Sequence, residues 1–170
     1  MRIVVKIMGV VVATVVSGVT LLPMGPSYAA SGEEVIKARI DFMKDEMEVQ
    51  WKTLAAYAKN GTGSLADVEK SARALVEIVK KIPEHFPKDT GRGRYPDDVT
   101  RALPAIWKDW EGFQKDAQRL AAESETLARL AKEGNKDAVV TMIGTSGSYA
   151  RTKIGCAECH DTYRGERAKK

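Results

Sequence analysis

The stretch Cys156-Ala157-Glu158-Cys159-His160 contains both cysteines of the chain and one of its two histidines. A Cys-x-x-Cys-His sequence is the attachment signature of c-type haem. Residues three apart lie on one face of a helix, so both thiols can reach the vinyl groups of a single porphyrin. The imidazole of the next residue then faces the iron as its proximal ligand. The stretch therefore predicts one covalently attached haem c, held by Cys156 and Cys159, with His160 on the iron.

Three other uses of the two cysteines are weaker interpretations. A disulfide between them is compatible with an oxidising compartment. A thioredoxin-like redox motif needs a strand followed by a helix, and no such context is visible around Cys156. A structural zinc site needs four ligands, but the chain offers only the two thiols, His160 and His85. His160 is also adjacent to Cys159, which is poor geometry for closing a tetrahedron.

Residues 1–29 have the pattern of a bacterial signal peptide. Arg2 and Lys6 precede an uncharged apolar run over 7–22, and Ser27-Tyr28-Ala29 supplies small residues at the cleavage-site spacing. The apolar run is short for a membrane span, which needs about 20 residues. We expect cleavage before Ala30, export to the periplasm, and no stable membrane span after cleavage.

The mature chain, residues 30–170, is predicted to form one domain with little net charge. The full chain carries a formal charge of +4, and removal of Arg2 and Lys6 lowers it to about +2. A nucleic-acid-binding domain usually has a strong basic excess. We therefore expect no nucleic-acid partner.

Four amphipathic segments predict four helices. The spacing of apolar residues places them over 33–59, 65–82 and 104–133, with the last running from 136 through the haem motif. In the first segment the predicted buried stripe consists of Ile36, Ile40, Met43, Met47, Trp51, Leu54 and Ala58. Two short connections and a proline-rich crossover over 84–103 then describe an all-α, antiparallel, up-down-up-down four-helix bundle, with the haem motif near the C-terminus of the last helix.

Several residues mark where these helices begin and end. Gly61 can cap the first helix, and Ser64 with Asp67 can start the second. Gly144 and Gly147 each lower the helix propensity of the last segment by about 1 kcal/mol relative to alanine. They indicate either a close approach of another group or a local break in that helix, and both alternatives stay open at the level of sequence.

The chain resembles the cytochrome c′ family, the class II c-type cytochromes, over essentially all of residues 30–170. The resemblance rests on four stretches: Ile36-Lys37-Ala38-Arg39 with Met43, Ile82-Pro83-Glu84-His85-Phe86-Pro87, Pro104-Ala105-Ile106-Trp107-Lys108-Asp109-Trp110, and Cys156 to Arg164. Cytochrome c′ is itself a known up-down-up-down four-helix bundle. The segment between Asn135 and Cys156 is longer than is usual in the family.

The resemblance implies a role for seven residues around the haem. It places the two thioethers on Cys156 and Cys159 and the proximal ligand on His160, with Arg164 as the arginine near that ligand. It makes Arg39 the contact of a haem propionate. On the distal side it places Met43 at the iron and Phe86 as the aromatic residue beside the pocket. The resemblance also implies homodimers, which the family often forms. Apolar residues of the first helix that lie outside its predicted buried stripe, such as Val35, Phe42 and Val49, allow a homodimer here.

Met43 decides between two functions that the resemblance implies. In one branch of the family a methionine at this position ligates the iron. Such His/Met ligation raises the haem potential and gives an electron carrier that serves redox partner proteins. In the other branch the iron is five-coordinate and binds nitric oxide or carbon monoxide, and Met43 would only fill space, as core methionines usually do.

We expect electron transfer with Met43 on the iron, and gas binding is the alternative. Neither function is enzymatic. A peroxidase-like enzyme would need a distal acid-base group, typically a histidine, and the pocket matched by the resemblance has none.

Overall fold

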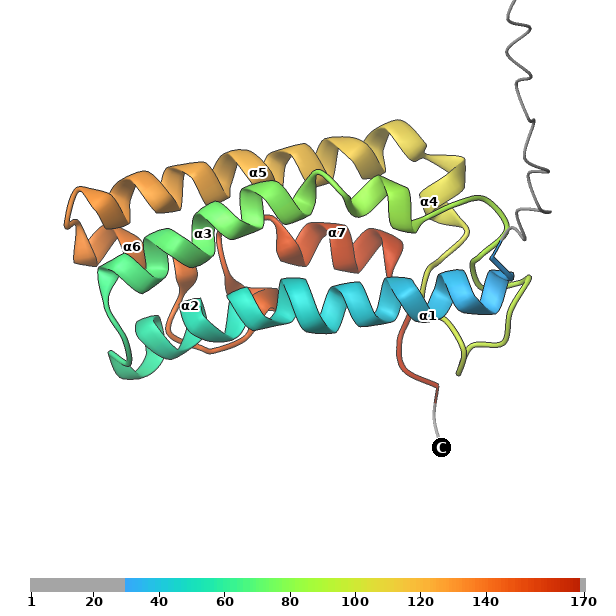
Figure 1. The fold of residues 1–170 in the computed structure, drawn as a ribbon, viewed down its shortest axis with the longest axis horizontal. Coiled ribbons are helices and arrows are strands. Elements are labelled where there is room, and N and C mark those ends of the chain that lie inside the picture. Colours follow the sequence, from blue (N-terminus) through green and yellow to red (C-terminus); the bar gives the residue numbers. More distant parts are fainter. Residues whose placement is uncertain (1–29, 169–170) are drawn as a thin grey trace, which may run out of the picture.

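Residues 30–168 are described by a computed structural model, in which helices lie side by side along one long axis (Figure 1). The signal peptide predicted over residues 1–29 lies outside these residues and stays a prediction. Within 30–168 there is no β-strand, only isolated bridges between Arg92 and Tyr95 and between Ala102 and Arg164. None of the helices in this part of the chain has both the length and the apolar character that a bilayer crossing requires.

Four arms make up the bundle, which confirms the predicted fold class. The helices are α1 (Gly32–Phe42), α2 (Glu48–Asn60), α3 (Leu65–Val79), α4 (Ala105–Lys108), α5 (Trp110–Lys132), α6 (Lys136–Ile143) and α7 (Cys156–Tyr163). A π-helical turn over Met43–Met47 joins α1 to α2, and the two together form the first arm. The second arm is α3, the third is α4 with α5, and the fourth is α6 with α7.

Local sequence explains the boundary between the first two arms. Gly61 has a φ of 65°, and its N–H donates to the carbonyl of Tyr57 at 2.9 Å. The Ser64 hydroxyl accepts from the Asp67 N–H at 3.2 Å, and the Asp67 carboxylate accepts from the Ser64 N–H at 2.8 Å. These are a left-handed glycine cap and a capping box, as the sequence predicts.

The π-helical turn shifts the buried face of the first arm. The predicted stripe includes Ile40, but this side chain is 37% exposed, whereas Arg39 and Phe42 are each 4% exposed. A π-turn inserts one extra residue into an α-helix. The core-facing residues just before Met43–Met47 are therefore Arg39 and Phe42 instead of Ile40, whereas Ile36 is buried as predicted. The predicted stripe is therefore wrong at Ile40 and correct at Ile36, and the buried Phe42 is not available to a dimer interface.

The third arm breaks at Asp109, where a continuous helix is predicted from Pro104. Asp109 has φ −126° and ψ 60°, outside the helical region. Its carboxylate accepts hydrogen bonds from the Gly112 N–H at 3.1 Å and from the Tyr163 hydroxyl at 2.8 Å. Asp109 therefore caps α5 and ties it to the end of α7, and this tertiary contact compensates for the lost helical turn.

The fourth arm is also interrupted, and the break comes together with a close approach of another backbone segment at Gly144. Gly144 ends α6 with a φ of 79°, and a Cβ at this position would lie 2.9 Å from the carbonyl oxygen of Arg151. Gly147 has a φ of 69°. Residues 144–155 are irregular apart from a short 3-10 turn over Tyr149–Arg151, and α7 starts afresh at Cys156. The continuous helix predicted from residue 136 is wrong, and the local break is correct.

The core between the arms contains one hydroxyl without a partner. Its fully buried side chains include Leu54, Val68, Ile106, Leu127, Val139 and Ile143. Ser124 in α5 lies among them with 0% exposure, and its Oγ makes no hydrogen bond within the described residues. An unpaired buried hydroxyl lowers the stability of a fold.

We expect Ser124→Ala to raise the free energy of unfolding by about 1 kcal/mol, because the variant no longer buries an unpaired polar group. Urea unfolding followed by circular dichroism measures the change. Thr126→Ala is the matched control, because Thr126 is exposed on the same helix and surface changes are usually within about 0.5 kcal/mol. A loss of stability in Ser124→Ala would contradict the assignment of the hydroxyl as unpaired.

Candidate haem site

The haem motif forms the first part of α7. Cys156 and Cys159 lie one helical turn apart as free, half-buried thiols that pack against the apolar core. Burial raises the pKa of the Cys156 thiol to about 12 and that of the Cys159 thiol to about 11. Thiols with such high pKa values are poor nucleophiles at neutral pH, because the thiolate is the reactive form. The folded environment therefore does not favour disulfide exchange.

Two of the alternative uses of the cysteines find no support in the structure. The two sulfur atoms are not joined in a disulfide. Over residues 30–168, no group of three or more His, Cys, Asp and Glu side chains is arranged to hold a metal ion. A structural zinc site would need four such ligands.

His160 is half-buried on the same helix. Its ring packs edge-on against Tyr149, with 5.1 Å between centroids and an interplanar angle of 79°. Burial, followed by the positive charges of Arg164 and Arg101, lowers the pKa of His160 to about 4. The imidazole is therefore neutral at pH 7, which is the form that ligates metals.

Three buried polar atoms without partners surround α7. Within the described chain these are Nδ1 of His160, Nε of Arg164 and Nε of Arg119. Arg119 belongs to α5, and a Cβ at Gly155 would lie 3.4 Å from its Nε. Since buried polar groups are nearly always paired in native proteins, unpaired atoms at one place indicate a further group there. The residues present fit a haem, which would bring its iron and two carboxylates.

Both ends of α7 are fastened to α5. At the start, the Glu123 carboxylate accepts a hydrogen bond from the Gly155 N–H. At the end, the Tyr163 hydroxyl donates to Asp109 at 2.8 Å. Cys156, Cys159 and His160 therefore lie on a short helix that is braced at both ends. Sequence reasoning did not find Glu123, because an acidic residue on an exposed-looking helix face carries no distinguishing signal.

Met43 lies at the first position of the π-helical turn. Its side chain is half-buried and packs against the apolar core, as does that of Met47. π-turns inside α-helices frequently occur at functional sites. Ligation of the iron by Met43 stays a prediction.

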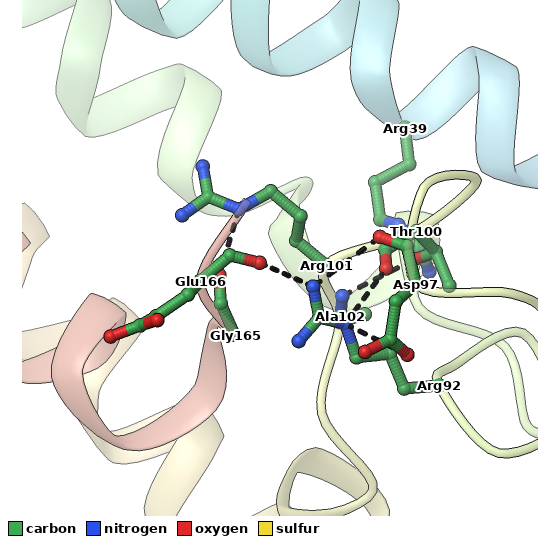
Figure 2. Close-up of polar contacts among 8 residues, drawn as sticks. All are labelled: Arg39, Arg92, Asp97, Thr100, Arg101, Ala102, Gly165 and Glu166. Atoms are coloured by element: carbon green, nitrogen blue, oxygen red, sulfur yellow. Dashed lines mark hydrogen bonds and ion pairs between the residues drawn. The ribbon is translucent and has the colours of Figure 1, made fainter. Parts of the chain in front are cut away.

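Arg39 is buried, and both of its terminal nitrogens bind the crossover segment, where Figure 2 shows it beside Thr100. Nη1 donates to Thr90 Oγ1 at 3.0 Å and to the His85 carbonyl at 3.5 Å. Nη2 donates to the Thr90 carbonyl and to Thr100 Oγ1, both at 2.8 Å. Burial lowers the pKa of Arg39 to about 10, so the group is charged at neutral pH. Arg39 fastens the crossover to α1, and its contact with a propionate stays a prediction.

Phe86 and Arg164 lie in two separate aromatic groups. The Phe86 ring lies 4.8 Å from the Arg39 guanidinium and packs edge-on against Phe113 at 4.9 Å. The Arg164 guanidinium covers the ring of Tyr149 at 5.1 Å and donates to its hydroxyl at 2.6 Å. Tyr149 therefore lies between Arg164 and His160. The sequence did not reveal Tyr149, because it falls in the irregular segment where no helical pattern assigns it a face.

The fold and the site together define a class of protein: a c-type cytochrome built on a four-helix bundle. A family model described as Cytochrome C′ matches residues 34–164. The chain belongs to the cytochrome c′ family. Members carry one covalently bound haem c. That Cys156 and Cys159 attach it in this chain stays a prediction.

Individual relatives agree with this assignment. The chain is 31% identical over 150 residues to cytochrome c′ of Rhodopseudomonas palustris, covering 87% of this chain and 93% of the relative. It is 33% identical over 114 residues to cytochrome c-556 of Agrobacterium tumefaciens, covering 66% and 82%. Among solved structures, cytochrome c′ from Rhodobacter spheriodes superposes with a TM-score of 0.64 at 26% identity, covering 81% of this chain and all of the other.

Proposed function

We propose that this protein is a periplasmic cytochrome c′ whose five-coordinate haem iron binds nitric oxide or carbon monoxide. The observation that carries the proposal is the placement of Met43, whose side chain packs against the apolar core. In five-coordinate members of the family an apolar side chain at this position crowds the distal face. Moving a polar or charged ligand from water into apolar surroundings costs desolvation free energy, whereas this cost is small for neutral diatomic gases. Several relatives are named cytochrome c′, which supports the proposal.

The same proposal includes a homodimer. One cytochrome c′ of known structure, 26% identical with a TM-score of 0.62, is described as showing ligand-controlled dimer dissociation. On this chain the first arm exposes Ile40 at 37% and Val49 at 47%. These two side chains, rather than the buried Phe42, are the apolar surface that a second copy would cover.

Electron transfer with Met43 as the sixth ligand is the second candidate. The observation that favours it is the π-helical turn, which begins at Met43, because such turns concentrate at functional sites. The relatives also include proteins named cytochrome c-556 and cytochrome c-554. In this case the protein would exchange electrons with redox partner proteins at the higher potential that His/Met ligation gives.

Optical spectra of the purified holoprotein, of Met43→Leu and of Met47→Leu separate the two functions. For five-coordinate iron we expect a high-spin ferrous spectrum in all three proteins, and conversion to a low-spin spectrum when carbon monoxide is added. The physical reason is that no protein atom occupies the sixth position. A low-spin ferrous spectrum with a sharp α band that is lost in Met43→Leu and kept in Met47→Leu would contradict gas binding and establish the second candidate.

A further inference from the structure

Four arginines gather where the crossover segment meets the end of α7. They are Arg92, Arg101, Arg164 and Arg167, and after burial it is the charges of Arg164 and Arg167 that most lower the pKa of Arg101. Among residues 30–168, only Arg92 of these four has a carboxylate partner, with its Nε 3.5 Å from Asp97. Like charges at close range repel one another, so the cluster indicates an anionic group that the protein chain itself does not supply.

The backbone fixes Arg101 beside the segment that follows the proximal histidine. The Arg101 carbonyl accepts from the Gly165 N–H at 2.8 Å, and Arg101 Nε donates to the Gly165 carbonyl at 2.7 Å. Two residues further on, the Leu103 N–H donates to the Tyr163 carbonyl at 3.0 Å. Since Tyr163 lies about one helical turn after His160, Arg101 stands at the end of the haem helix.

The terminal guanidinium nitrogens of Arg101 are available to bind a further group, whereas those of Arg39 are already hydrogen-bonded. The two terminal nitrogens of Arg101 make no hydrogen bond or ion pair within the described part of the chain, and only its Nε is used. Figure 2 shows the Arg101 guanidinium pointing away from Arg92 and Asp97. The two terminal nitrogens of Arg39 both donate to Thr90, and they also reach acceptors on either side of it along the crossover. A guanidinium with two available terminal nitrogens matches the geometry of a carboxylate.

We infer that Arg101 binds a propionate carboxylate of the haem through its two terminal nitrogens. Arg39 supports this contact indirectly, because it holds Thr100, the residue next to Arg101, against α1. The inference rests on the presence of the haem and not on the distal ligand. It therefore holds for either of the two functions above, and its failure would leave both of them untouched.

The test compares Arg101→Met with Arg94→Met in the purified holoprotein. Arg94 is exposed on the same crossover segment, so it controls for the loss of a nearby surface charge. Without Arg101 the propionate charge is uncompensated and favours ferric iron. We expect the equilibrium constant for reduction to fall threefold to tenfold in Arg101→Met, which lowers the midpoint potential by about 30 to 60 mV for a one-electron couple. Arg94→Met should change it much less.

Resonance Raman spectra of the same proteins report on the propionate directly. We expect the propionate-bending band to shift in Arg101→Met, to stay unchanged in Arg94→Met, and to return towards the wild-type position in Arg101→Lys, which keeps the cation. If Arg101→Met does not fold, Arg101→Gln replaces it, because the amide can still donate to Gly165. An unchanged band would overturn the inference even with a shifted potential, since Arg101 would then act only as a nearby charge.

Discussion

Replacement of Cys156 and Cys159 together by alanine will leave the chain without covalently attached haem. The two thiols are the only cysteines in the protein, and thioether formation needs a sulfur at one position at least. Acid-acetone extraction followed by absorbance of the protein fraction measures the loss. The expected result is complete removal of haem absorbance from the double variant, compared with full retention in the wild type.

The single variants Cys156→Ala and Cys159→Ala are the matched controls, because each keeps one thiol one helical turn from the other position. We expect each single variant to retain haem that resists acid-acetone extraction, in reduced yield, because one thioether still holds it. Haem that remains bound to the double variant after extraction would contradict the assignment of the motif, and with it the assignment of His160 as proximal ligand.

Arg39→Met will reduce the stability of the holoprotein by about 3 kcal/mol or more, because charge-assisted hydrogen bonds contribute about 1.5–3 kcal/mol each. The variant keeps an unbranched apolar stem but removes the guanidinium, and with it three bonds of 2.8 to 3.0 Å to Thr90 and Thr100. It also leaves buried acceptors unpaired. A loss of this size is a large fraction of the 5–15 kcal/mol that is typical of a whole domain.

Urea unfolding monitored by circular dichroism tests the Arg39 prediction. Lys37→Met is the matched control, since Lys37 lies on the same helix with a 77% exposed side chain. Its ion pair with Asp41 is a surface pair, and such pairs contribute about 0–1 kcal/mol. If Arg39→Met were no more destabilising than Lys37→Met, the crossover segment would be held by other contacts than those of Arg39.

Features that depend on neighbouring residues could be predicted from the sequence. Ser64 and Asp67 are three residues apart, so their reciprocal hydrogen bonds follow from helix geometry alone. The same is true of Gly61, whose left-handed conformation needs no side chain from elsewhere in the chain. The helical placement of the haem motif belongs to this group as well, because Cys156, Cys159 and His160 lie within a little over one turn of a single helix.

Features that depend on distant residues could not be predicted. The break at Asp109 is stabilised by a hydroxyl 54 residues away, on Tyr163. The sequence around Asp109 has an otherwise helical pattern and does not indicate this partner. The hydrogen-bond acceptors of Arg39 within the chain are another example. They lie 46 to 61 residues further along the chain, in a crossover segment without periodicity. The propionate contact that the resemblance implies for Arg39 stays a prediction.

The extra residue in the Met43–Met47 turn affects how this chain is to be aligned with its relatives. An insertion inside an amphipathic helix normally rotates everything beyond it by about 100°, since an α-helix has 3.6 residues per turn. Here a single turn absorbs the insertion, so Arg39 and Leu54 both stay buried on either side of it. Against a relative without the extra residue, an alignment anchored at Arg39 places Met43 at the distal position, whereas one anchored at Leu54 places Lys44 there. If Met43 faces the haem as proposed, a one-residue insertion or deletion in this turn, and not only a substitution, would exchange the side chain at the distal position.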